Sequence, residues 1–173
     1  MPPALSPETV EDRLRHWPVA RLATLRDSGA AHLVPVVFHW EGSRLWIPVD
    51  GKPKRDRELE RVRNIERDPR ATLLVDAYGD DWAALWWIHL EGRATIRRDE
   101  ASEDFGDAAE GLRRKYPQYQ DVPLFRGVPT LIEITPERQT SWCARDGSSG
   151  GSEGANATDP PNGGQGRAET EDE

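Results

Sequence analysis

The chain has 173 residues and a formal net charge of −8, which allows one domain with a substantial core. Its single cysteine, Cys143, excludes an internal disulfide framework and any zinc cluster built from cysteines. No apolar run is long enough for a membrane span, and residues 1–6 do not resemble a signal peptide. We therefore expect a cytoplasmic protein with no membrane partner.

The acidic residues are concentrated at the C-terminal end. From residue 146 onward, seven acidic side chains accompany Arg167 alone, within sequence rich in Gly, Ser and Pro. Such a composition buries too little apolar surface to fold. We predict one folded domain over residues 1–145 and a disordered acidic tail over 146–173. The folded part is then close to neutral, so we expect no nucleic-acid partner.

Short strands joined by tight turns dominate the folded part. Ser6 and Pro7 are typical of a helix start, and they predict a short helix over 7–17. A mainly β fold with some helices (α+β) is expected, in the form of a small antiparallel barrel of six to seven strands. Further helices are predicted over 56–68 and 102–115, and strands over 19–25, 30–40, 44–49, 70–78, 86–98, 128–135 and 138–144.

Positive charge gathers where the helix over 56–68 should begin. Lys52, Lys54 and Arg55 surround Pro53 there. A helix N-terminus already carries partial positive charge, so cations at that end are unfavourable. Exposed amides together with basic side chains form a receptor for phosphate or another anion. The alternative interpretation is an ordinary solvated basic turn.

Other candidate residues favour structural roles. Trp86 and Trp87 are neighbours on one predicted strand, so one should enter the core while the other faces a ligand or partner. His32 and His39 should face opposite sides of a single strand, and we predict no metal site. Cys143 is expected to be a small buried hydrophobic residue. No dinucleotide-binding glycine motif, P-loop or serine-hydrolase motif occurs.

The order of motifs between residues 8 and 145 resembles the pyridoxamine 5′-phosphate oxidase-like split barrels. The match is strongest with the subgroup that uses the deazaflavin coenzyme F420. The motifs are ARLATL at 20–25, HLVPVVF at 32–38, LWIPVD at 45–50, Asn64 with Ile65, DPRATLLV at 68–75, GRA at 92–94, and Trp142.

The resemblance implies a homodimeric split barrel with two cofactor sites between the subunits. A basic group would hold the cofactor phosphate, and Trp142 would close the site from the other subunit. Asp50 would either bond the ring edge or cap the next helix, and capping is the stronger expectation. The implied cofactor-binding residues are Val34, Pro35, Val36, Val37, Pro48, Val49, Asp50, Lys52, Lys54, Arg55, Trp87 and Trp142.

The chain departs from the vitamin B6 oxidases in one respect. Residues 33–38 contain no lysine or arginine, whereas those enzymes hold the flavin phosphate with basic residues there. We therefore expect hydride transfer between F420 and an unsaturated or quinone-like small molecule, with no acid or base identified. FMN is the alternative cofactor. A non-catalytic cofactor carrier, or a haem protein using His39 or His89 as axial ligand, is the remaining alternative.

Overall fold

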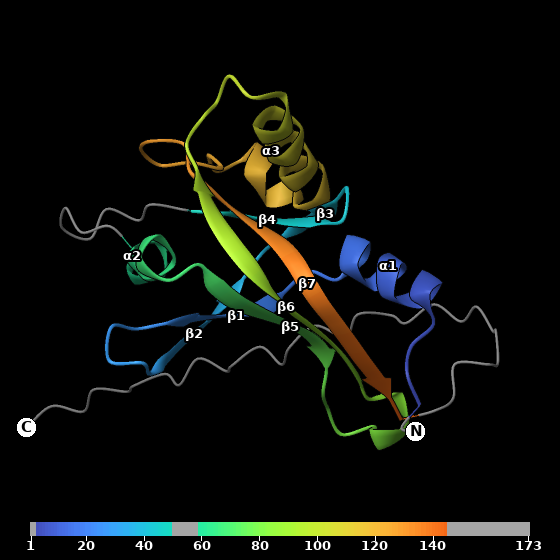
Figure 1. The fold of residues 1–173 in the computed structure, drawn as a ribbon. Helices are drawn as coiled ribbons and strands as arrows, with labels where there is room; N and C mark the ends of the chain where they lie inside the picture. Colours follow the sequence, from blue (N-terminus) through green and yellow to red (C-terminus); the bar gives the residue numbers. More distant parts are fainter. Residues whose placement is uncertain (1–2, 50–58, 145–173) are drawn as a thin grey trace, which may run out of the picture.

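The computed structural model describes residues 3–49 and 59–144, and these form one curled antiparallel sheet with helices around it (Figure 1). The strand order is β2-β1-β5-β6-β7-β4-β3. The expected mainly β architecture is confirmed. The strands are β1 (Ala20–Leu25), β2 (Ala31–Val36), β3 (His39–Glu41), β4 (Arg44–Pro48), β5 (Arg70–Ala77), β6 (Trp86–Arg97) and β7 (Leu131–Cys143); the helices are α1 (Pro7–His16), α2 (Glu60–Arg67) and α3 (Glu103–Lys115), with short 3-10 turns η1 (Trp82–Ala84) and η2 (Pro117–Gln120).

Two long strands, β6 and β7, run the length of the sheet and join its two parts. β5 and β1 continue the sheet beyond β6, whereas β4 and β3 continue it beyond β7. The ladder shifts register between Glu91 and Gly92. A Cβ atom at Gly92 would lie 2.2 Å from the carbonyl oxygen of Thr135, so only glycine fits this close approach. The shift lets the two strands bend together, which curls the sheet into a half-barrel.

Two strand boundaries differ from the sequence-based prediction. The strand expected over 30–40 is divided into β2 and β3, because the Tyr116 hydroxyl takes the place of a strand partner and accepts a hydrogen bond from Phe38 N (3.0 Å). His32 and His39 therefore lie on different strands, so the expectation of one shared strand is wrong. Conversely, the two strands expected over 128–135 and 138–144 are one strand, β7, with Pro136 at its register shift.

The helix starts follow local sequence. Ser6 Oγ accepts from Thr9 N (3.2 Å) and Pro7 occupies the first turn of α1, which confirms the predicted cap. The described part of the helix predicted over 56–68 is α2, with Leu59 as its N-cap residue. Residues 50–58, including the whole basic segment, lie outside the described residues, as do residues 145–173 with the predicted tail.

Apolar side chains fill the inside of the half-barrel. The inward positions of β1, β5 and β6 supply Leu22, Leu73, Ile88 and Leu90, which are fully buried there. A second cluster packs α3 against β4 and β7 and contains Trp46, Phe105, Ala108, Ala109, Leu112, Tyr116, Leu124 and Leu131. None of the described helices has the length and apolarity needed to cross a bilayer.

Candidate functional site

A groove of about 700 Å³ lies on the outer face of the sheet, over β1, β5 and β6. Its walls are mainly apolar, with an ion pair and an imidazole among them. Because a sheet of this kind normally covers its apolar surface, a groove with such walls marks a candidate binding site. The lining residues are Arg21, Ala23, Leu33, Thr72, Leu74, Asp76, Tyr78, Trp87 and His89.

Strand alternation separates the two neighbouring tryptophans, as the sequence predicts. Trp86 is 5% exposed and points inward, where its ring packs edge-on against that of Trp17, with 4.7 Å between the ring centres. The Arg13 guanidinium lies 3.9 Å from the centre of the same ring. Trp87 faces the groove instead. One indole therefore belongs to the core, and the next is available to a ligand or partner.

Trp142 of β7 lies beside Trp87 on the outer face. The two residues are directly opposite each other in the β6–β7 ladder, and opposite residues of an antiparallel pair project from the same face. Asp76 occupies the same row on the other side of Trp87. The sheet register thus brings two indoles from distant parts of the sequence side by side on one face, and Trp87 lines the groove.

The polar groups of the groove come from three strands. Arg21 of β1 donates a hydrogen bond to Asp76 of β5, and the two form an ion pair. His89 of β6 is opposite Leu74, and its Nδ1 lies 3.6 Å from Glu91 Oε1. These groups could bind the polar edge of a ligand whose body contacts the apolar walls.

Among the predicted cofactor-binding residues that the structure describes, only Trp87 lines this groove. Pro35 is exposed and opposite Arg21, so it shares the outer face with Trp87 and Trp142. The remaining described residues of that set are directed elsewhere. Val36 and Pro48 are buried, and the half-buried Val34, Val37 and Val49 pack against the core clusters. Asp50, Lys52, Lys54 and Arg55 lie outside the described residues.

Several groove residues were missed from the sequence, and the signal that could have revealed them is alternation. Arg21 and Ala23 occupy the outward positions of β1, and Thr72, Leu74 and Asp76 occupy those of β5. A period of two defines these positions once the inward residues are known. Pairing of β1 with β5 is a long-range contact, however, and no local pattern predicts it.

The histidines and the cysteine have distinct environments. His39 lies against α3, where a Cβ at Gly111 would be 2.2 Å from its Nε2, and burial lowers the pKa of His39. His39 is therefore not a groove residue, unlike His89. Cys143 is buried, as expected. Within residues 3–49 and 59–144, no three His, Cys, Asp or Glu side chains gather into a metal site.

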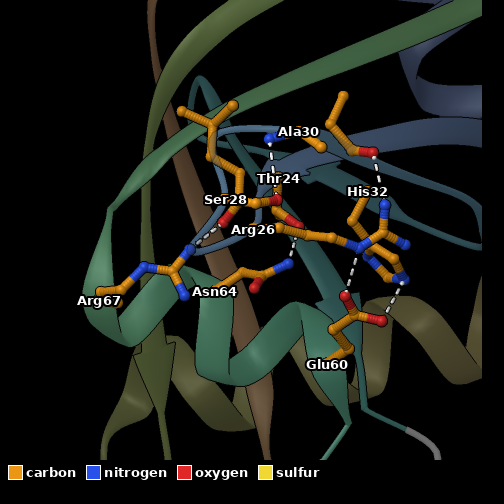
Figure 2. Close-up of polar contacts among 10 residues, drawn as sticks. Thr24, Arg26, Ser28, Ala30, His32, Glu60, Asn64 and Arg67 are labelled. Atoms are coloured by element: carbon orange, nitrogen blue, oxygen red, sulfur yellow. Dashed lines mark hydrogen bonds and ion pairs between the residues drawn. The ribbon is translucent and has the colours of Figure 1, made fainter.

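A second polar site lies at the start of α2, beside the β1–β2 hairpin (Figure 2). Glu60 Oε1 accepts a hydrogen bond from Arg26 Nε (2.6 Å), and Glu60 Oε2 lies 3.5 Å from His32 Nε2. The hydrogen bond from Arg26 holds the pKa of Glu60 below its ordinary value. His32 Nδ1 is buried and has no hydrogen-bond partner in the described part of the chain. This site adjoins the point where the chain leaves residues 50–58.

Comparison with known proteins places this chain in a family. The family described as pyridoxamine 5′-phosphate oxidase matches residues 6–143. The chain belongs to this family. The half-barrel of seven antiparallel strands is accordingly a split barrel of the pyridoxamine 5′-phosphate oxidase type.

Solved structures share the fold at low sequence identity. A conserved hypothetical protein from Mycobacterium tuberculosis has a TM-score of 0.67 at 20% identity, over 88% of this chain and 94% of that one. An FAD-binding protein from Mesorhizobium loti has a TM-score of 0.60 at 18% identity, over 82% of this chain and 95% of that one. A haem storage protein from Vibrio cholerae has a TM-score of 0.63 at 15% identity, over 81% of this chain and 94% of that one. These similarities establish the fold. The ligand of this chain has to be inferred from its own residues.

Proposed function

We propose that this protein is a cytoplasmic F420-dependent oxidoreductase whose outer groove receives the deazaflavin ring. The observation that carries the proposal is the apolar groove lined by Trp87, with Trp142 directly opposite Trp87 in the β6–β7 ladder. Planar aromatic side chains stack well against a planar ring system. The family resemblance over the folded part of the chain supports a flavin-type ligand in particular.

The groove residues fit such a ring by shape and polarity. Leu33 and Leu74 provide aliphatic walls, while the Trp87 indole provides a flat surface. The Arg21–Asp76 pair and His89 offer hydrogen bonds at a polar ring edge. When bound, the deazaflavin supplies the hydride-transferring atom. The protein's part is to bind, orient and desolvate the reactants, with an unsaturated or quinone-like small molecule as acceptor.

The phosphate of the cofactor is assigned to Lys52, Lys54 and Arg55. Two arguments support this assignment: three cations precede α2, and residues 33–38 contain none. Charge-assisted hydrogen bonds from lysine and arginine suit a phosphodiester. Without basic residues on β2, the bound phosphate depends on the segment before α2. Val34, Val36, Val37, Pro48 and Val49 would then contact the cofactor through backbone atoms, because their side chains are directed to the interior.

A homodimer is part of the proposal, because the groove is incomplete in one chain. Leu33 is 62% exposed and Tyr78 is 72% exposed at its margin. Large apolar side chains in one patch on a sheet face favour coverage by a partner. A second copy of this chain would cover them and enclose the ring between subunits. Sedimentation should therefore give a dimer, and a monomer that binds the cofactor equally well would contradict the shared site.

The first experiment is a titration of the purified protein with F420 and, separately, with FMN. Tryptophan quenching and cofactor absorbance report binding, and reduced F420 with quinone-like acceptors reports turnover. Selective binding of F420 is expected, with affinity falling by roughly tenfold in Trp87→Ala, since one base–aromatic stacking contact is worth about 1–3 kcal/mol. Trp82→Ala is the matched control, because Trp82 is 79% exposed and does not line the groove.

The other outcomes of this titration separate the alternatives. Preference for FMN would assign the protein to the flavin enzymes of the same fold. Tight F420 binding without turnover of any acceptor would indicate a cofactor carrier. Equal affinity of Trp87→Ala and the parent protein for the cofactor would show that the deazaflavin ring does not bind in the groove.

Haem binding is a second candidate, and the position of His89 favours it. His89 lines the groove, so its imidazole is available as an axial ligand, whereas His39 is packed against α3. The fold is shared with a haem storage protein. Addition of haemin should then give a Soret band that His89→Ala abolishes. A band of unchanged position and intensity in His89→Ala would exclude this residue as the ligand.

A further inference from the structure

An ion pair lies among the apolar walls of the outer groove. Arg21 of β1 donates a hydrogen bond to Asp76 of β5, and both side chains line the groove. The Asp76 side chain is only 11% exposed, against 45% for Arg21. Withdrawal of a carboxylate from water is costly unless the group is paired and hydrogen-bonded. A shielded carboxylate in a mainly apolar groove is therefore a candidate for ligand recognition.

The sheet register places this pair beside a flat apolar surface. Arg21 is directly opposite Leu74 in the β1–β5 ladder, and Asp76 follows Leu74 by two positions on the same face. Asp76 is also directly opposite Trp87 in the β5–β6 ladder. Directly opposite residues have Cβ atoms about 5 Å apart. The carboxylate and the outward-facing indole can therefore contact one planar ligand together.

The two charged side chains keep unused hydrogen-bonding capacity. A guanidinium has several N–H donors in a planar fork, and an ionised carboxylate has several acceptor sites. Within residues 3–49 and 59–144, the one hydrogen bond of either side chain is the bond between Arg21 and Asp76. Most of the donors and acceptor sites are thus available to a ligand in the groove.

A purely structural role is the simpler alternative, and a second ion pair shows what that role requires. Opposite charges on neighbouring strands stabilise a sheet only modestly. Glu91 of β6 is opposite Thr72 and pairs with Arg138 of β7, with 3.6 Å between the charged atoms. Neither Glu91 nor Arg138 lines the groove, and the Glu91 side chain is 44% exposed. The greater shielding of Asp76 and its place on the groove wall distinguish it from this surface pair.

A donor and an acceptor side by side match the edge of a cyclic imide. Such an edge presents a carbonyl oxygen, an N–H group and a second carbonyl oxygen in order. A carboxylate can accept from the N–H while a guanidinium donates to a carbonyl oxygen, and both bonds are of the stronger, charge-assisted kind. Flavins and deazaflavins carry this imide in their pyrimidine ring. A quinone edge presents acceptors only, and the propionates of haem are anions that Asp76 would repel.

We propose that Arg21 and Asp76 determine specificity for the imide edge of the bound ring: Asp76 accepts the ring N–H, and Arg21 donates to the adjacent carbonyl oxygen. The inference rests on the proposed function, which places the ring in the groove. It adds the orientation of that ring, with the imide end over β1 and β5 and the Trp87 indole beside it. It applies to F420 and FMN alike, because both contain the imide.

The test uses rings that differ only in the imide hydrogen. Riboflavin is compared with its derivative methylated at the imide nitrogen, and the deazaflavin ribityl compound is compared with its own N-methyl derivative. None of these ligands carries a phosphate, so binding depends on the ring and its ribityl chain. Tryptophan quenching and ligand absorbance report the affinities. The parent protein should bind each unmethylated ring roughly tenfold more tightly than its N-methyl form, the effect of one lost charge-assisted hydrogen bond.

Substitutions of Asp76 should abolish this preference. Asp76→Ala should bind the unmethylated rings roughly tenfold more weakly than the parent does, and the N-methyl rings with unchanged affinity. Asp76→Leu should lose the preference in the same way, because it has no acceptor. Exclusion of the methyl group by bulk alone would leave the preference intact in Asp76→Leu, whose side chain is as bulky as that of the parent.

Arg21→Ala separates recognition from loss of the ion pair. The guanidinium is assigned to a carbonyl oxygen that both forms of each ring possess. Arg21→Ala should therefore weaken both forms by a similar factor and keep the preference for the unmethylated ring. Arg21→Ala and Asp76→Ala remove the same ion pair, so a purely structural role would give the two variants the same binding pattern.

Glu91→Ala is the matched control. It removes a carboxylate that is paired with an arginine on the same face of the sheet, outside the groove wall. The preference for the unmethylated rings should remain as large as in the parent protein.

The possible failures are distinct. If the parent protein binds neither kind of ring, the proposed function is wrong and the specificity role is overturned with it. If the parent binds the rings but methylation has no effect, or if the preference persists in Asp76→Ala, ring binding stands and only the role of Asp76 is overturned. Unchanged affinities in Arg21→Ala would overturn the role of Arg21. A preference in one arm alone supports the role and identifies which ring the groove takes.

Discussion

Two helices, α2 and α3, are attached to the same sheet by different means. α3 buries Phe105, Ala108 and Leu112 in an apolar cluster with β4 and β7. α2 uses a stripe of polar side chains against the β1–β2 hairpin, beside the apolar residues Val62 and Ile65. Apolar burial is large but non-directional, whereas hydrogen bonds contribute less and demand one geometry. We infer that the apolar contacts of α3 contribute mainly to the stability of the domain, whereas the polar contacts of α2 mainly fix the orientation of that helix on the sheet.

The end of α3 shows how the two modes combine. The Tyr116 hydroxyl accepts from Phe38 N, and it lies 2.9 Å from the carbonyl oxygens of both Pro18 and Phe38. Burial raises the pKa of Tyr116 to about 12. Lys115 Nζ lies 3.8 Å from the centre of the Phe38 ring and 3.3 Å from Leu14 O. The C-terminal end of α3 therefore meets α1 and the segment between β2 and β3 at one partly polar joint, formed by Tyr116, Lys115 and Phe38.

The largest effect should come from the apolar attachment. Leu112→Ala removes a fully buried side chain of α3, and it should lower the free energy of unfolding by about 2–5 kcal/mol because a cavity remains. Denaturant unfolding measures this change. The exposed position Glu110 on the same helix provides the control, since Glu110→Ala should alter stability little. A small loss in Leu112→Ala would show that α3 contributes less than its burial implies.

The second-largest loss of stability should come from a change at the joint. Tyr116→Phe keeps the ring but leaves Phe38 N buried without its acceptor, so a loss of about 1–3 kcal/mol in unfolding free energy is expected. Hydrogen exchange at the Phe38 amide should accelerate at the same time. Tyr119→Phe is the matched control, because Tyr119 is half-buried on η2 next to the same ring. Equal losses in both variants would assign no special role to the Tyr116 hydroxyl.

The polar attachment of α2 should contribute less to stability. Asn64→Ala removes the hydrogen bond to Thr24, worth about 1 kcal/mol net in denaturant unfolding. Replacement of both partners, in Asn64→Leu with Thr24→Val, should recover part of this loss because no unpaired group remains buried. If the double variant is as unstable as the sum of the single variants, the pair is not coupled as the structure indicates.

A different kind of effect, a dependence of the stability on pH, is expected at the joint. Burial lowers the pKa of Lys115 to about 7, from an ordinary value of 10.5. Between these values the unfolded state binds one more proton than the folded state, so stability should rise with pH across this interval. Below about pH 7 both states are protonated, and the full penalty of burying the ammonium applies.

Lys115→Met should abolish this slope. His39, Arg114 and Glu41 also lie near Lys115 and are unchanged in the variant; burial lowers the pKa of His39 below its ordinary value of 6.5, so His39 is neutral over the range measured. Unfolding measured from pH 6.5 to 10.5 should show the parent protein gaining stability relative to Lys115→Met as pH rises. A constant difference between the two proteins would mean that Lys115 stays charged in the folded state.

Several features of the fold follow from adjacent residues and were predictable. The Ser6 cap, the alternation of residues 70–77 and the opposed directions of Trp86 and Trp87 each depend on local geometry. The errors occurred where a distant residue intervenes. Tyr116 divides the strand expected over 30–40, and the β6–β7 ladder carries Pro136 through a strand that local rules would end there.

The candidate site shows the same division. The sequence predicts that one of two adjacent tryptophans faces outward, and the family resemblance adds Trp142 as a cofactor contact. Only the sheet register decides that Trp87 and Trp142 are neighbours on one face, because pairing partners are chosen by the whole sheet. The inward direction of Val34 and Val36 was likewise not predictable without the position of the core.

The sequence by itself determined composition, secondary-structure periods, helix caps and the basic segment before α2, since each depends on residues close together in the chain. The tertiary structure alone decided which side chains meet across strands and helices. The groove with Arg21, Asp76 and Trp87, and the contacts of Glu60 with Arg26 and His32, are of this kind. Such contacts are chosen by packing of the whole domain, and no local pattern encodes them.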